Sequence, residues 1–134
     1  MPNIRLLLAT NNITVTQKLQ KSLQMHPEIS LIGHATQSND IISLCAKNTP
    51  HVILFESIDD ASLALIKDLR AIHPSCNIIT IAHQVDVNHA RKHLNAGVTG
   101  YLLEDDIFSG LTDSIWTAHQ GKSVISTEIT RALI

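Results

Sequence analysis

Histidines are the side chains in this sequence best suited to chemistry near neutral pH, and three of them fall close together. His89 and His93 are spaced i, i+4 in a segment of helical period, so they share one helix face, and His83 lies upstream beside Asp86. Imidazole binds zinc and also titrates near neutral pH, so this spacing suggests a zinc site or a pH-sensitive face. The alternative is ordinary surface histidines at the solvent edge of the helix, and we favour this alternative.

Other reactive or ligand-binding motifs are weak. Cys45 and Cys76 lie in apolar surroundings and form no C-x-x-C motif, which indicates buried free thiols in a reducing compartment. Asn11 and Asn12 follow an apolar run, but the sequence has no glycine-rich nucleotide-binding loop. We therefore predict no cofactor and no resident metal.

Length and composition indicate one ordinary globular domain. The chain has 134 residues, of which 44% are hydrophobic and 16% charged, and its formal net charge is -2. Such a balance gives no reason to expect a nucleic-acid or membrane surface. The N-terminal apolar run is too short for a signal peptide or a membrane span, so the predicted location is cytoplasmic.

Short runs rich in Ile, Leu and Val alternate with segments of helical period. Continuous apolar runs are typical of parallel strands buried on both faces. Five strands are predicted, at Ile4–Ala9, Ser30–Ala35, Val52–Phe55, Ile78–Ala82 and Gly100–Leu103. Five helices are predicted between and after them, marked by Val15 and Leu19, Ile41 and Cys45, Leu65 and Leu69, Ala90 and Leu94, and Leu111 and Ile115. The alternation predicts an α/β fold: a doubly wound, five-stranded parallel sheet flanked by five helices.

Capping residues set the expected helix ends. Ser38–Asp40 and the pair Asp59–Asp60 are expected to cap the second and third helices. Gly97 and Gly121 are expected to close the fourth and fifth. We predict a domain over residues 1–121, followed by a tail, 122–134, in which a helix begins near Ser126 or Thr127 and leads towards a linker.

Several segments, in order, resemble response-regulator receiver domains (CheY-like, flavodoxin-like), particularly the LuxR/NarL type. The matching segments are Ile4–Leu8, His26–Ile29, Pro50–Leu54, His73–Pro74, and Ala96–Leu103, which is the strongest. The segment from Gly121 onwards resembles that group's exit towards a linker. The resemblance covers essentially the whole chain, and another flavodoxin-like domain is the structural alternative.

The resemblance implies one reaction, the transfer of a phosphoryl group to an aspartate that ends the third strand. An acidic pair holds a divalent metal, and a hydroxyl and a lysine contact the phosphoryl oxygens. Five positions correspond to these groups, and all five are changed: Thr10 and Asn11 for the acidic pair, Glu56 for the aspartate, Ala82 for the hydroxyl and Glu104 for the lysine. The loop after Glu56 is about two residues shorter than in the family, so its metal ligand is not carried over.

These changes predict a pocket that no longer performs phosphoryl transfer. Thr10 and Asn11 offer no carboxylate to a hard cation. Glu56 would misplace its carboxylate by about 1 Å, and Glu104 would repel an anionic donor. Glu56 either fills the vestigial pocket or imitates the phosphorylated state, and we favour filling. Asp59 or Asp60 as a substitute phosphoacceptor is the weaker alternative to capping.

Two aromatic residues point to signalling surfaces. Tyr101 corresponds to the aromatic residue that changes rotamer with phosphorylation in the family. Trp116 follows Ile115 by one helical position and is expected to point away from the core. We predict an interaction face on the fourth helix, fifth strand and fifth helix, with Trp116 near its centre and including His89, His93, Asp113 and Glu104.

The sequence therefore predicts a phosphorylation-independent pseudo-receiver rather than an enzyme. We expect it to act by protein–protein interaction or as a homodimer, in transcriptional regulation, with any DNA contact made through an output domain outside this chain. The alternative is a sensor that binds a small ligand or a metal through the vestigial pocket or through His83, His89 and His93.

Overall fold

A six-stranded, wholly parallel sheet forms the centre of the protein in the computed structural model, which describes residues 3–56 and 61–134. The strand order is β2-β1-β3-β4-β5-β6. The strands are β1 (Ile4–Ala9), β2 (Ile29–Ala35), β3 (Val52–Glu56), β4 (Asn77–Ala82), β5 (Gly100–Leu103) and β6 (Val124–Ile125). The five predicted strands are confirmed, but the count of five was wrong because β6 is too short to show a strand pattern.

Seven helices surround the sheet within the described residues. They are α1 (Ile13–Leu23), α2 (Ser38–Asn48), α3 (Ala61–Ile72), α4 (Val87–Ala96), α5 (Glu104–Ser109), α6 (Leu111–His119) and α7 (Thr127–Leu133). The five predicted helices correspond to α1 to α4 and α6, and α7 begins where the tail helix was expected. The prediction of five helices omitted α5, whose six residues include only one buried side chain, Ile107.

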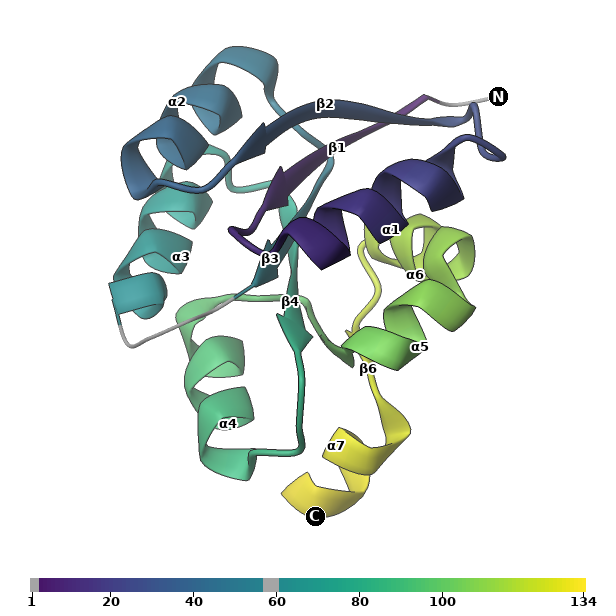
Figure 1. The fold of residues 1–134 in the computed structure, drawn as a ribbon. Coiled ribbons are helices and arrows are strands. Elements are labelled where there is room, and N and C mark those ends of the chain that lie inside the picture. Colours follow the sequence, from purple (N-terminus) through teal and green to yellow (C-terminus); the bar gives the residue numbers. More distant parts are fainter. Residues whose placement is uncertain (1–2, 57–60) are drawn as a thin grey trace.

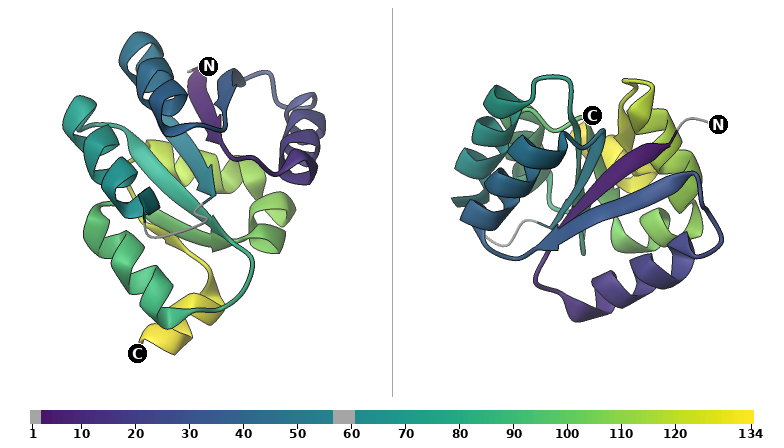
Figure 2. Two further views of the ribbon diagram at one scale, coloured as in Figure 1. Left: turned by 60° about the vertical axis from the view of Figure 1, so that its left-hand side comes forward. Right: turned by 90° about the horizontal axis from the view of Figure 1, so that it is seen from above.

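The helices form a layer on each face of the sheet. α1, α5 and α6 cover one face, and α2, α3 and α4 cover the other (Figures 1 and 2). Each face has its own hydrophobic core between helices and strands. The core on the first face includes Val15, Leu19 and Ile115 from the helices and Leu6, Leu8 and Ile79 from the strands. The core on the second face includes Ile41, Cys45 and Leu69 from the helices and Leu7, Ile53 and Ile78 from the strands. Burial on both faces explains why the strands have continuous apolar sequences.

Polar side chains cap the N-termini of two helices, and the predicted cap of α2 was wrong. The Asn12 side chain caps α1 by accepting from the backbone N–H groups of Thr14 and Val15, at 3.0 and 3.3 Å. Asp86 caps α4 by accepting from the N–H of His89 at 3.1 Å. The predicted cap at Ser38–Asp40 was wrong, because these residues already belong to α2, whose N-cap Gln37 makes no side-chain hydrogen bond. The predicted cap at Asp59–Asp60 lies outside the described residues.

The chain ends on the sheet edge beside β5. Gly100 and Tyr101 of β5 pair with Val124 and Ile125 of β6, and α7 then turns under α4 (Figure 1). A side chain at Gly100 would lie 3.1 Å from the carbonyl oxygen of Val124 and 3.0 Å from Ile79 Cγ1. The close approach of β6 therefore favours glycine at this position, because a side chain would force its neighbours to shift.

Both cysteines are free and buried, as predicted. Burial raises the pKa of the Cys76 thiol to about 12 and also raises the pKa of Cys45, so neither is poised for thiolate chemistry.

Candidate functional site at the carboxyl ends of the strands

The polar residues assigned to the vestigial pocket meet at the carboxyl edge of the sheet. Thr10, Glu56 and Glu104 end or directly follow β1, β3 and β5, and Ala82 ends β4. The strand order reverses between β1 and β3, since β2 lies on the outer side of β1. Ligand sites of open α/β sheets form at such switch points, so the topology places these residues where a site is expected.

Glu56 is the centre of this site and is nearly buried, with 8% of its surface exposed. The Thr10 hydroxyl donates to Glu56 Oε1 at 2.6 Å, and the Asn12 side-chain amide donates to Glu56 Oε2 at 3.4 Å. Thr10 Oγ1 in turn accepts from the backbone N–H of Asn12 at 2.9 Å. A buried carboxylate needs such donors, and here they come from the residues that link β1 to α1.

The residue that completes this cluster is Asn12, whereas the sequence placed Asn11 there. Asn11 is exposed, and it lines a pocket of about 200 Å³ together with Thr10, Glu56 and Ser38. Asn12 contacts Glu56 while capping α1, so one side chain serves both the helix end and the site. An Asn one residue before a helical pattern is a capping signal, and this signal could have identified it.

His83 joins the two carboxylates of the pocket. Its Nε2 lies 2.5 Å from Glu56 Oε2, and its Nδ1 lies 3.0 Å from Glu104 Oε2. The hydrogen bond to Glu56 raises the pKa of His83 most; the carboxylates of Glu56 and Glu104 raise it further, whereas partial burial lowers it. The imidazole thus stands between the two carboxylates, a contact that the sequence did not predict.

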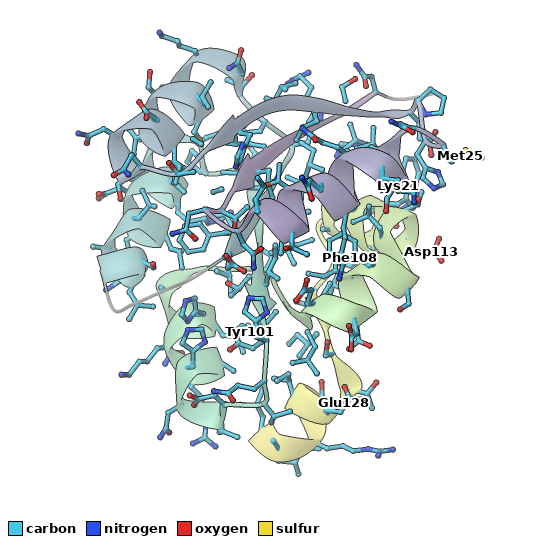
Figure 3. The ribbon with its side chains drawn as sticks, in the orientation of Figure 1. Lys21, Met25, Tyr101, Phe108, Asp113 and Glu128 are labelled. Atoms are coloured by element: carbon cyan, nitrogen blue, oxygen red, sulfur yellow. The ribbon has the colours of Figure 1, made fainter. Side chains whose placement is uncertain are left out.

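Lys18 of α1 completes the charge balance. Its Nζ lies 3.6 Å from Glu104 Oε1 and 5.6 Å from the centre of the Phe108 ring, and Figure 3 shows Phe108 on α5 beside α1. With His83 protonated, the cluster holds two carboxylates and two cations. We call Thr10, Asn12, Glu56, His83, Glu104 and Lys18 the bridge cluster.

Tyr101 lies on the neighbouring strand with its ring fully buried. Its hydroxyl lies 2.5 Å from His89 Nδ1, and the His89 ring stacks on His93 with the ring centres 4.0 Å apart. Burial, helped by the negative charge of Asp86, raises the pKa of Tyr101 to about 12, so its hydroxyl stays protonated at neutral pH. Tyr101 is thus attached to α4 through His89.

The three histidines singled out in the sequence have different surroundings. His83 belongs to the bridge cluster, His89 contacts Tyr101, and His93 Nδ1 lies 2.8 Å from the carbonyl oxygen of His89. The expectation that His93 lies at the solvent edge was wrong: it is 2% exposed, because it faces the side of α4 that covers Tyr101. Among the described residues, no group of three or more His, Cys, Asp or Glu is arranged to hold a metal ion.

The C-terminal segment covers the sheet edge that the predicted interaction face included. The Ser126 backbone N–H donates to the carbonyl oxygen of Tyr101 at 3.1 Å, and Ser126 Oγ accepts from the N–H of Leu103 at 2.8 Å. Ile129 of α7 is fully buried against Tyr101 and Ala90. The predicted face, with Trp116 near its centre, therefore does not include an open edge of β5, because β5 pairs with β6 and Ile129 of α7 packs on Tyr101.

Trp116 points away from the core, as predicted, and is 40% exposed. Its ring contacts that of His119, which in turn packs against His51 with the ring centres 4.7 Å apart. Asp113, one helical turn before Trp116, is exposed and projects from the outer side of α6 (Figure 3). Trp116 and Asp113 thus share the exposed face of α6, separate from the covered edge beside β5.

No helix within residues 3–56 and 61–134 has the length and apolar character needed to span a bilayer.

Comparison with known proteins finds similarity to transcriptional regulatory proteins, although no family model matches the chain. It is 26% identical over 126 residues to an uncharacterized transcriptional regulatory protein, YxjL, of Bacillus subtilis (strain 168), covering 92% of this chain and 58% of that protein. It is 21% identical over 133 residues to the transcriptional regulatory protein DegU of Brevibacillus brevis, covering 98% of this chain and 56% of that protein. The chain therefore spans little more than half the length of these relatives.

Solved structures share the fold. The RcsB response regulator of Salmonella typhimurium superposes with a TM-score of 0.85 at 22% identity, covering 99% of this chain and 66% of that chain. The isolated receiver domain of RcsB from Salmonella enterica serovar Typhimurium, with a phosphomimetic, gives a TM-score of 0.84 at 20% identity, covering 98% and 99%. The fold is thus that of a response-regulator receiver domain.

Proposed function

We propose that this chain is a receiver-like signalling domain that works by protein–protein contacts without being phosphorylated, within a regulator of transcription. The observation that carries the proposal is the bridge cluster. Glu56 stands at the phosphoacceptor position, and both of its carboxylate oxygens are already engaged by Thr10, Asn12 and His83.

The chemistry of the cluster opposes phosphoryl transfer. The positions of the family's acidic pair hold Thr10 and Asn11, neither of which supplies the carboxylate oxygens that a hard divalent cation prefers. The hydroxyl position is Ala82 and the lysine position is Glu104. The groups that would neutralise charge on a transferring phosphoryl group are thus missing from their places.

Judged from the sequence alone, Glu56 lacked the partners needed to imitate a phosphorylated aspartate. The hydrogen bonds around Glu56 in the structure favour such an imitation. Such imitation needs a hydroxyl and a cation to receive the charge, and the family's places for them are Ala82 and Glu104. Here the hydroxyl is that of Thr10, and the group placed to supply a cation is His83, both from other positions. We therefore include in the proposal that Glu56 is a fixed negative centre in the pocket, held by its hydrogen-bond donors.

The partner proposed for this domain is a second copy of itself or another protein. The RcsB neighbours include a structure of two dimers bound to DNA, and the relatives are named as transcriptional regulators. We propose that any DNA contact is made through an output domain outside residues 1–134 and that the protein works in the cytoplasm. The contact surface that we propose is the exposed face of α6 with Trp116 and Asp113.

Sedimentation of the chain tests this function. We expect self-association, or binding to its partner, to be the same with and without acetyl phosphate and Mg²⁺. We expect Trp116→Ala to weaken it roughly thirty-fold, since truncating an interfacial Trp costs about 2 kcal/mol or more. Ile72→Ala is the matched control, because Ile72 is 41% exposed on α3, on the opposite layer.

Near-ultraviolet and far-ultraviolet circular dichroism control for folding, and we expect Trp116→Ala to stay folded, since Leu111 and Ile115 hold α6 in the core. Association that appears only with the phosphoryl donor, or that Ile72→Ala weakens as much as Trp116→Ala, would contradict the proposal.

A further inference from the structure

His83 is placed to bind a proton between two carboxylates. Each ring nitrogen faces an oxygen, Glu56 Oε2 at 2.5 Å and Glu104 Oε2 at 3.0 Å. Ionised carboxylates only accept hydrogen bonds, so both nitrogens donate at once only in the doubly protonated imidazolium form. A neutral imidazole keeps one N–H and turns a lone pair towards the other carboxylate.

The two carboxylates differ in how firmly they are held. Glu56 is nearly buried at the end of β3 and is fixed by Thr10 and Asn12. Glu104 is more exposed, begins a six-residue helix, and has Lys18 as its other partner at 3.6 Å. When His83 loses a proton, its remaining N–H therefore stays with Glu56, whose burial makes an unmet hydrogen bond costly, and the contact to Glu104 breaks.

Glu104 is covalently joined to the residue that anchors the C-terminal segment. Leu103, its neighbour, donates its N–H to Ser126 Oγ at 2.8 Å, and Ser126 is buried. Ser126 links β6 to α7, and Ile129 of α7 packs on Tyr101. A shift of Glu104 therefore acts directly on the hydrogen bond that holds the segment to β5.

We propose that His83 is a proton-binding site that replaces phosphorylation as the input to this domain, and that proton binding strengthens the docking of residues 122–134. The inference rests on the proposed function, because a receiver-like domain that is not phosphorylated needs another input signal, and proton binding would be that signal. The segment is the part of the chain nearest to any output domain beyond residue 134, so its docking is the signal passed on.

The direction of the effect follows from the pKa of His83, which lies above its ordinary value of 6.5. The bridge contributes its full stabilisation below pH 6.5 and loses it as the pH rises through the pKa of His83 in the folded protein. The segment is therefore docked most firmly on the acidic side.

Other titratable groups near His83 are Glu56 from β3, Glu104 from α5, Lys18 from α1, and Asp86, His89 and Tyr101, which line the same pocket as His83. Asp59 and Asp60 lie outside the described residues. His89 is the histidine placed nearest to the docked segment, because it contacts Tyr101, on which Ile129 of α7 packs. His51 is different: burial and then the nearby Arg5 lower its pKa, so it titrates at lower pH.

Nuclear magnetic resonance of the ¹⁵N-labelled chain, from about pH 5.5 to about pH 9, tests the inference. We expect the His83 ring to titrate above 6.5, and the amide signals of Ser126 and Ile129 to shift with the same midpoint. In His83→Gln the shift of the segment's signals should vanish. In Glu104→Gln the midpoints of His83 and of the segment should fall together.

His89→Gln is the matched control and should leave the segment's midpoint in place. The inference is overturned if His83 titrates at or below 6.5, if the segment's signals keep their midpoint in His83→Gln, or if they lose it only in His89→Gln. A failure of the proposed function is a separate result, since a phosphoryl adduct on the wild-type chain would refute that function whatever these midpoints show.

Discussion

At the scale of single residues, the bridge cluster shows how side chains from separate segments satisfy a buried carboxylate. The sequence identified Thr10, Glu56, Ala82 and Glu104 as the pocket, because the strand ends could be located from apolar runs. It did not identify the partners that fill the pocket. His83 and Asn12 enter it through side-chain directions after β4 and before α1, and these directions depend on packing that no local pattern encodes.

The hydroxyl group of Thr80 is expected to lower the stability of the fold. Thr80 lies in the middle of β4, fully buried, and its hydroxyl has no hydrogen-bond partner. A buried hydroxyl without a partner costs about 1–3 kcal/mol relative to a satisfied one. We therefore expect Thr80→Val, which replaces the hydroxyl by a methyl group of similar size, to stabilise the protein by about 1 kcal/mol in urea unfolding.

Thr16→Val is the matched comparison for this prediction. Thr16 is also buried, but its hydroxyl donates to the carbonyl oxygen of Asn12 at 3.2 Å. Its replacement should destabilise the protein by about 1 kcal/mol. Midpoints that move in the same direction for both variants would show that the Thr80 hydroxyl is not an energetic burden.

At the scale of elements, the sequence located helices and strands most reliably where the apolar or helical pattern extended over many residues. All five long strands and the helices α1 to α4 and α6 were located from runs and periods, because each buries several side chains. α5 and β6 were missed because six residues and two residues carry too little periodic signal. Both elements depend on tertiary contacts, α5 on the burial of Ile107 and β6 on pairing with β5.

The close packing of β6 against Gly100 of β5 leads to a prediction about this glycine. In Gly100→Ala the new methyl group would lie 3.1 Å from the carbonyl oxygen of Val124, which is backbone and cannot rotate away. We expect β6 to be displaced, with a loss of about 1–3 kcal/mol in stability. Limited proteolysis should then cleave within residues 122–134 at lower protease concentration than in the wild type.

Gly110→Ala is the control for this change, since a side chain at Gly110 would meet only the carbonyl oxygen of Asp106, at 3.9 Å. It should leave the cleavage pattern unchanged. Equal resistance of the Gly100→Ala and wild-type chains would mean that β6 does not depend on the close approach to β5.

At the scale of the whole molecule, the fold resembles that of receiver domains, but the fold alone does not determine the chemistry of the site at its carboxyl edge. The parallel sheet with helices on both faces is that of receiver domains, with TM-scores of 0.84 and 0.85 against RcsB structures. The carboxyl edge of that sheet carries a hydrogen-bonded Glu–His–Glu arrangement of Glu56, His83 and Glu104. A receiver fold therefore does not by itself establish a phosphorylated receiver.

The molecule also differs from the sequence-based expectation in which surface it leaves open. The edge beside β5 is covered by the chain's own β6 and α7 (Figure 1). By contrast, α6 exposes Trp116 and Asp113, and Figure 3 shows Asp113 on its outer side. The predicted exposure of Trp116 is confirmed, and its role as a contact residue stays a prediction. The sequence did not predict the covering, because the tail was expected to lead away from the domain.

Intact-mass spectrometry after incubation with acetyl phosphate and Mg²⁺ tests the central claim, phosphorylation independence, most directly. A response-regulator receiver that accepts phosphate, treated in the same tube, controls for the donor. We predict that the mass of this chain stays unchanged while the control gains a phosphoryl group, because Glu56 is engaged on both oxygens and neither Thr10 nor Asn11 offers a carboxylate to the metal. A stoichiometric phosphoryl adduct on the chain, lost in Glu56→Gln, would contradict the account.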